Sequence, residues 1–132
     1  MTAETARQIE AYLTVSGSPL DAFAEISELN LPGPAIARAL DRFAKRFVKL
    51  SELGIDTSDF VFSAEFGRNL EYYTGHVFQI EAESQNGPVQ VVGGGRYDKL
   101  LGDLGAEEQI PAVGFAIHTE RLAAVMKEFA DD

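Results

Sequence analysis

Three short segments rich in glycine, tyrosine and arginine lie in the second half of the 132-residue chain. They are residues 67–75 (GRNLEYYTG), 93–98 (GGGRYD) and 111–122 (PAVGFAIHTERL). A guanidinium group binds a carboxylate or phosphate through paired hydrogen bonds, and a tyrosine combines an apolar ring with a hydrogen-bonding hydroxyl. Glycine lets a ligand approach the backbone closely. Together the segments predict a pocket that recognises a small zwitterion or nucleotide.

The arginines of these segments are the candidates for binding an anion. Arg68 is the sharpest of them, and a surface ion pair with Glu65 or Glu71 is its alternative role. Arg121 lies at the start of the last predicted helix, where free backbone N–H groups favour an anion, and Glu120 or a C-terminal carboxylate is its alternative partner. Taken alone, each arginine would be expected to form an ion pair. We favour ligand binding for both because the other two segments occur in the same part of the chain.

The tyrosines and glycines supply the rest of the predicted pocket. Tyr72 and Tyr73 are adjacent, so on a regular strand at most one of them faces the pocket. The glycines at 93–95 are expected either to end a strand tightly or to let a ligand approach. Arg96, Tyr97 and Asp98 follow them directly and the tyrosine pair precedes them, and we therefore favour ligand approach.

The sequence lacks the residue patterns of several common metal, catalytic and nucleotide-binding sites. The chain has no cysteine, and its two histidines, His76 and His118, are far apart and accompany no metal-binding or Ser-His-Asp pattern. The triplet 93–95 lacks the G-x-G-x-x-G spacing, and no phosphate-binding G-x-x-x-x-G-K-[ST] sequence occurs. We assign no general acid–base pair among the scattered carboxylates. The expectation is no catalytic residue, no metal and no cofactor.

Composition limits the class of partner. Eleven Lys and Arg against 21 Asp and Glu give a net charge of −10, which disfavours nucleic acid as a partner. The basic residues between Arg38 and Lys49 recur at helical spacing and are typical of a solvated helix face. No segment approaches the ~18 apolar residues of a membrane span, and the N-terminus lacks a signal-peptide pattern. We therefore predict a cytoplasmic protein that does not bind a membrane.

The first part of the chain has helical periodicity. Breaks at residues 16–19 and 31–34 separate three predicted helices, and Ser18 is a possible N-cap with Pro19 in the first turn. The predicted helices cover residues 6–13, 20–28 and a long stretch from about 35 to a C-cap at Gly54.

From residue 59 the period changes to that of strands. The sequence predicts strands over residues 59–66, 76–83 and 88–92, a hairpin turn at Asn86-Gly87, a short helix over 97–101, a buried strand over 112–117 and a final helix. This order predicts an α+β fold with an antiparallel sheet. The predicted division is a helical segment, 1–56, followed by the sheet-containing part, 57–132.

In order and content, the three segments resemble the R-G-L-D-Y-Y-T-G, G-G-G-R-Y-D and P-A-V-G-F-A-x-G-x-E-R-L elements of the histidyl-tRNA synthetase-like class II family. The resemblance covers about half of the chain. It implies the antiparallel class II synthetase-like sheet flanked by helices, here only its C-terminal portion after a helical insertion. The pocket residues that it implies for a histidine-like ligand are Arg68, Tyr72, Tyr73, Gly94, Gly95 and Tyr97, and it implies an ATP contact for Arg121.

The sequence also departs from the synthetase pattern. Asn69 and Glu71 replace a Gly and an Asp, and His118 with Thr119 replaces a Gly and an apolar residue. An imidazole at position 118 would occupy space that a nucleotide needs, so His118 and Arg121 are expected to form a degenerate nucleotide site. We expect these residues to be a piece of a longer protein, because the family's earlier motifs have no counterpart before residue 59.

These departures resemble the synthetase-like family of regulatory subunits of ATP phosphoribosyltransferase. That resemblance implies a non-catalytic subunit that self-associates and joins a short-form catalytic subunit in a hetero-oligomer. It also implies a role in the first step of histidine biosynthesis and in feedback control by histidine. The alternative is a fragment of a histidine-tRNA ligase core that forms histidyl-adenylate.

Overall fold

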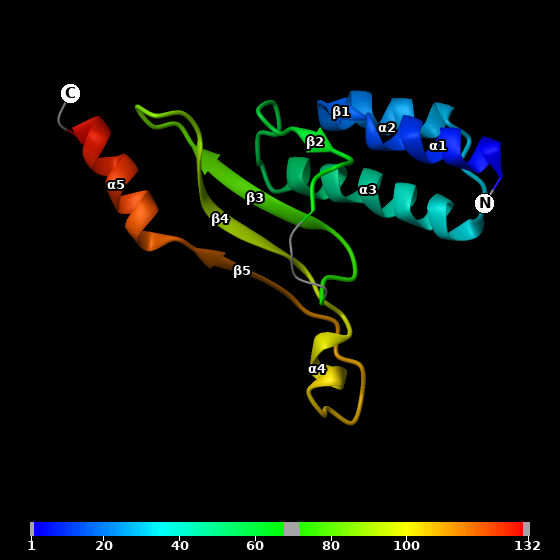
Figure 1. Ribbon diagram of the computed structural model, residues 1–132. Coiled ribbons are helices and arrows are strands. Elements are labelled where there is room, and N and C mark those ends of the chain that lie inside the picture. Colours follow the sequence, from blue (N-terminus) through cyan, green and yellow to red (C-terminus); the bar gives the residue numbers. More distant parts are fainter. Residues whose placement is uncertain (1, 68–71, 131–132) are drawn as a thin grey trace. The chain divides into compact units, whose positions relative to one another are not determined.

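The computed structural model describes residues 2–67 and 72–130 (Figure 1). The chain divides into two compact units, residues 1–66 and 67–132, which we call the N-terminal and C-terminal units. The division lies later in the chain than the boundary predicted after residue 56, and that domain boundary stays a prediction. Within the described ranges, no helix is both long and apolar enough to cross a membrane.

The N-terminal unit contains the helices α1 (Ala3–Leu13), α2 (Pro19–Glu28) and α3 (Pro34–Glu52). The predicted cap of α2 is confirmed, because the Ser18 hydroxyl oxygen accepts the Asp21 N–H at 3.2 Å and Pro19 occupies the first turn. The predicted end of α3 is also confirmed. Gly54 has a φ of 71°, a left-handed conformation that glycine adopts without strain.

Short strands close this unit, and here the sequence prediction was wrong. A strand was expected over residues 59–66, but β2 covers only Phe62–Ser63 and pairs with the equally short β1, Ser16–Gly17. The chain turns directly after β2, where the Phe66 N–H donates to the Ser63 carbonyl at 3.2 Å. The alternating phenylalanines instead pack on α3: Phe62 lies edge-on to Phe43, and Phe60 lies edge-on to Phe47. The alternating phenylalanines therefore reflect aromatic packing on α3 and not a long hydrogen-bonded strand.

The C-terminal unit contains an antiparallel sheet in the order β3–β4–β5, so β4 is its middle strand (Figure 1). The strands are β3 (Val77–Ala82), β4 (Val89–Arg96) and β5 (Val113–Ile117). The predicted hairpin between β3 and β4 is confirmed, with the Gly87 N–H donating to the Ser84 carbonyl at 3.0 Å. The short helix α4 (Leu100–Asp103) begins three residues later than predicted, and α5 (Thr119–Ala130) follows β5.

The glycine triplet does not end a strand, contrary to one of the two expectations. Residues 93–95 lie inside β4, are buried, and pair with β3 on one side and β5 on the other. Two neighbouring strands supply hydrogen bonds to this backbone, which offsets the cost of about 0.5–1 kcal/mol for a glycine in a strand.

The expectation that the strand of residues 112–117 is buried was also wrong for the described part of the chain. Val113 and Phe115 are each 67% exposed and Ile117 is 48% exposed. These alternate residues share one face of β5. Apolar composition predicted the strand correctly, but it carried no information about what covers it.

Candidate functional site

Three tyrosine rings gather at one end of the sheet of the C-terminal unit. The ring centroids of Tyr72 and Tyr73 are 4.6 Å apart, and the ring of Tyr97 stands edge-on to Tyr72 at 5.4 Å. The hydroxyl oxygens of Tyr72 and Tyr73 are 3.5 Å apart. We call these three residues the tyrosine cluster. It presents phenol hydroxyls and ring faces together, as expected of a site for a small polar ligand with an apolar part.

The expectation that at most one of Tyr72 and Tyr73 faces the pocket applied to a regular strand, and that condition is not met. Residues 72–76 do not form a strand, so strict alternation does not apply to them. A turn-like segment brings both rings to the same side.

The tyrosine cluster packs on a glycine floor formed by Gly95 and Gly114, which are register partners on β4 and β5. A Cβ atom on Gly95 would lie 2.8 Å from two ring carbons of Tyr73. The hydroxyl of Tyr97 lies against the place where a Gly114 side chain would begin. The absence of side chains at these two positions is therefore what lets the rings approach the sheet.

Gly94 has its own steric requirement. A Cβ atom there would meet the Gly114 carbonyl oxygen and would lie 2.6 Å from the Cβ of Phe115. Glycine at position 94 therefore allows β4 and β5 to lie close together, whereas the glycines at 95 and 114 make room for tyrosine rings.

A set of backbone and side-chain hydrogen bonds holds Tyr97 in place. The Tyr97 N–H donates to the Ala112 carbonyl at 2.9 Å, and the Asp98 N–H donates to the Thr74 hydroxyl oxygen at 2.9 Å. Asp98 also receives the Arg96 Nε–H at 2.9 Å. These bonds tie the segment before β3 to the segment after β4, so the tyrosines of both segments keep a fixed relation.

The carboxylate of Asp98 has an incompletely satisfied oxygen. The Arg96 Nε lies 2.9 Å from Oδ1 as well, but the N–H is aligned with Oδ2. Oδ1 is buried and has no hydrogen-bond partner within the described residues. Thr74 and Asp98 belong to the quoted sequence segments, yet sequence reasoning gave neither a role of its own, because the contact between them joins positions 24 residues apart.

The predicted nucleotide residues lie away from the tyrosine cluster. The His118 N–H donates to the Val91 carbonyl at 2.8 Å, and the Arg121 Nη1 donates to the Gln90 carbonyl at 3.1 Å. Gly95 lies four residues further along β4, which is about 14 Å at 3.4 Å per residue. The structure thus brings together Tyr72, Tyr73, Tyr97 and Gly95, and places His118 and Arg121 near the other end of β4.

Arg121 forms no ion pair with Glu120 in the described part of the chain, and the C-terminal carboxylate lies outside the described residues. The bond from Arg121 to the Gln90 carbonyl ties the start of α5 to β4. Neighbouring Glu120 has a pKa below its usual value, because its own backbone N–H, the Thr119 hydroxyl and the nearby His118 favour the ionised carboxylate.

Arg68, the sharpest candidate from the sequence, lies outside the described residues. The other histidine, His76, precedes β3; its carbonyl accepts the Arg96 N–H at 2.8 Å, and its ring stacks on Phe78. Within the ranges that the structure describes, no three His, Asp or Glu side chains are grouped as a metal site would require.

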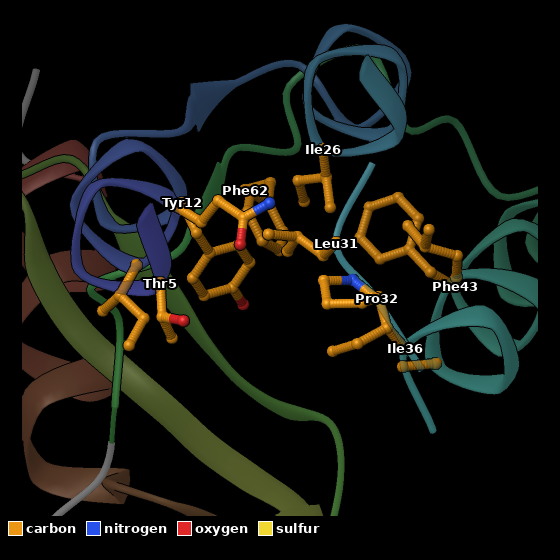
Figure 2. A pocket seen from close by; sticks show the side chains of 12 residues that line it. Thr5, Tyr12, Ile26, Leu31, Pro32, Ile36, Phe43 and Phe62 are labelled. Atoms are coloured by element: carbon orange, nitrogen blue, oxygen red, sulfur yellow. The ribbon is translucent and has the colours of Figure 1, made fainter. Parts of the chain in front are cut away.

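The N-terminal unit has a pocket that sequence reasoning missed. It has a volume of about 510 Å³ and lies among α1, α2, α3 and β2 (Figure 2). Most of its lining is apolar. The residues are Thr5, Gln8, Ile9, Tyr12, Ile26, Leu31, Pro32, Ile36, Ala39, Leu40, Phe43 and Phe62. The apolar stripes of the helices were visible in the sequence, but the space between them depends on packing between elements far apart in the chain.

Comparison with known proteins gives consistent relatives. The family described as "Histidyl-tRNA synthetase" matches residues 1–122. An ATP phosphoribosyltransferase regulatory subunit from Agrobacterium fabrum is 43% identical over 118 residues, which is 89% of this chain and 29% of that protein. A protein of the same name from Rhizobium rhizogenes is 39% identical over 120 residues, covering 90% of this chain and 32% of the relative. The chain therefore spans about a third or less of the length of these relatives.

A solved structure is also similar. The apo histidyl-tRNA synthetase of S. aureus matches with a TM-score of 0.54 and 25% sequence identity, over 97% of this chain and 36% of that one. Helices combined with antiparallel sheets agree with this similarity, and the predicted α+β class II synthetase-like fold is confirmed.

Proposed function

The chain belongs to the histidyl-tRNA synthetase family, and from this premise we propose that it is part of a non-catalytic regulatory subunit of ATP phosphoribosyltransferase. The observation that carries the proposal is the similarity to relatives of that name, at 43% and 39% identity over about nine-tenths of the chain. In this proposal the protein binds the short-form catalytic subunit, self-associates, and acts in the cytoplasm at the first step of histidine biosynthesis.

The proposed small-molecule ligand is histidine, bound at the tyrosine cluster. Phenol hydroxyls can accept from an ammonium group or exchange hydrogen bonds with an imidazole, while the rings pack on the ligand's apolar atoms. Arg68 is proposed to bind the carboxylate. The remaining proposed pocket residues are Tyr72, Tyr73, Gly94, Gly95 and Tyr97. Histidine binding there would give feedback control of the catalytic subunit.

The proposed loss of catalysis concerns the region of His118 and Arg121. The Arg121 guanidinium donates to a main-chain carbonyl, and the ring of His118 stands where the family pattern has a glycine. Both features support a nucleotide site that no longer works, so we propose no catalytic residue, metal or cofactor, and no nucleic acid partner.

A histidine-tRNA ligase is the second candidate, and the similarity to the S. aureus synthetase favours it. The two candidates differ in a measurable reaction. A ligase forms histidyl-adenylate and therefore exchanges pyrophosphate into ATP when histidine is present. The proposed regulatory subunit should show no such exchange.

The direct test uses the natural full-length protein that contains these residues. Mixing it with a short-form ATP phosphoribosyltransferase should form a complex and raise the rate of phosphoribosyl transfer, and histidine should lower that rate. Absence of a complex together with an unchanged rate would contradict the proposal. Histidine-dependent pyrophosphate exchange would replace it with the ligase.

A further inference from the structure

The pocket of the N-terminal unit opens between the apolar faces of α1 and α3. Ile9 and Tyr12 contribute from α1, while Ala39, Leu40 and Phe43 contribute from α3. Figure 2 shows Tyr12 on one side and Ile36 with Phe43 on the other, with Leu31 and Pro32 between them. Ile9 is 46% exposed. The pocket is thus an apolar recess that reaches the surface.

Few polar groups line this recess. Thr5, Gln8 and Tyr12 are the polar residues of the lining, and the Thr5 hydroxyl already lies 2.8 Å from the Thr2 hydroxyl. Sites for small molecules usually combine apolar walls with several convergent polar groups that fix the ligand's orientation. A recess that is almost wholly apolar and lies between two helices fits the apolar side chains of a third helix better.

The charge of α3 indicates which kind of partner helix would bind there. α3 holds five of the chain's 11 Lys and Arg but two of its 21 Asp and Glu, so its formal charge is +3 while the other residues together carry −13. A basic helix can bind an acidic partner even in an acidic chain. Charges within the ~8 Å screening length interact more strongly with the partner than the acidic residues farther away do.

One of these cations, Arg42, lies beside the pocket. Arg42 follows the exposed, pocket-lining Ala39 by three residues, so the two are surface neighbours, whereas Arg38 is next to Ala39 in the chain and is turned about 100° away from it around the helix. Lys45 and Lys49 pair with Asp41 and Glu52 at 2.8 Å. Arg38 and Arg42 have no carboxylate partner in the described part of the chain.

We propose that this pocket and its basic rim bind an acidic amphipathic helix of the catalytic subunit. Apolar side chains of that helix enter the recess between α1 and α3, and a carboxylate of that helix pairs with Arg42. The identity of the partner rests on the proposed function, whereas the chemistry of the surface rests on the pocket and the charge of α3. Nucleic acid is disfavoured by the recess, which offers aliphatic and phenyl walls rather than a charged groove.

The experiment uses the natural full-length protein and its catalytic subunit, with affinity measured by calorimetry at low and physiological salt. Ala39→Trp fills the pocket mouth from an exposed position, and Arg42→Glu reverses a rim charge. Ala37→Trp, on an exposed position of α3 outside the lining, controls for the indole. Lys127→Glu on α5 controls for the change in net charge. Circular dichroism checks that each variant keeps its helix content.

Ala39→Trp and Arg42→Glu should each weaken the complex about tenfold or more, and the two controls should stay within about twofold. The loss of affinity caused by Arg42→Glu should be smaller at physiological salt than at low salt. A complex that forms normally with both variants would overturn this inference and leave the proposed function standing. No complex with the unmodified protein would remove both. A dimer of this protein that Ala39→Trp alone disrupts, with catalytic-subunit binding intact, would instead assign the pocket to a second copy.

Discussion

The position of the Tyr73 ring depends on the absence of a side chain at Gly95. Two carbons of the Tyr73 ring lie 2.8 Å from the place of a Cβ on Gly95, and the His76 carbonyl oxygen lies 2.7 Å from the same place. One of these neighbours is a ring and the other is backbone that bonds to Arg96. A side chain at position 95 would therefore have to move both, and the tyrosine cluster depends on glycine at this position.

Gly95→Ala should destabilise the C-terminal unit by about 1–3 kcal/mol, because the added methyl group overpacks a closed contact. Urea unfolding followed by tyrosine fluorescence measures this, since the chain has no tryptophan and three of its four tyrosines form the cluster. Gly102→Ala is the matched control: its nearest neighbour, Gln109 Cγ, would lie 3.9 Å away. An unchanged midpoint for Gly95→Ala would contradict the described packing.

The Thr74 hydroxyl should be required for protection of the Asp98 amide. Thr74→Val keeps the size but removes the acceptor, and the loss of a hydrogen bond of about 1 kcal/mol should speed exchange of the Asp98 amide proton about fivefold. Thr74→Ser keeps the acceptor and should retain most of the protection. Equal exchange rates in the two variants would show that the bond from Asp98 to Thr74 does not hold this segment. Amide exchange followed by NMR distinguishes the outcomes.

The helices and the hairpin were predictable because their signals are local. Ser18 with Pro19 marks the start of α2, Gly54 marks the end of α3, and Asn86-Gly87 marks the β3–β4 turn. Each signal depends on conformational preferences of a few consecutive residues. Such preferences act in the same way in the isolated sequence and in the fold.

The grouping of the three tyrosines was predictable from the sequence, but its geometry was not, and its use as a ligand pocket stays a prediction. The sequence left open whether Tyr72 and Tyr73 lie on a regular strand and whether a strand ends at residues 93–95. Both points depend on non-local effects: β3 and β5 pair with the glycine segment, and the bond between Thr74 and Asp98 holds the turn-like segment. The pocket of the N-terminal unit was missed for the same reason, since three helices and a strand line it.

Glu120 should titrate below its usual pKa of 4.5 in the folded protein, since its backbone N–H and the Thr119 hydroxyl stabilise the carboxylate. A lowered folded pKa means that the contribution to stability is complete above the usual pKa and is lost as the pH falls through the lowered value. Thr119→Ala should raise the Glu120 pKa toward 4.5, and Thr119→Ser should not. Carboxyl NMR shifts recorded against pH measure both. A Glu120 pKa at or above 4.5 in the unmodified protein would contradict the hydrogen bonding at the start of α5.

Histidine bound at the tyrosine cluster should change the environment of Tyr73 and Tyr97, because their rings cover Gly95 and Gly114. Titration of the natural full-length protein with histidine should therefore shift the ring resonances of both tyrosines with one saturation curve. Tyr97→Phe removes one hydroxyl and should weaken binding about fivefold, the effect of one hydrogen bond of about 1 kcal/mol. Tyr12→Phe makes the same chemical change in the N-terminal unit, at a residue outside the tyrosine cluster, and should leave the affinity unchanged. Saturable histidine binding that leaves the resonances of Tyr73 and Tyr97 in place would assign histidine to another surface, such as a subunit interface.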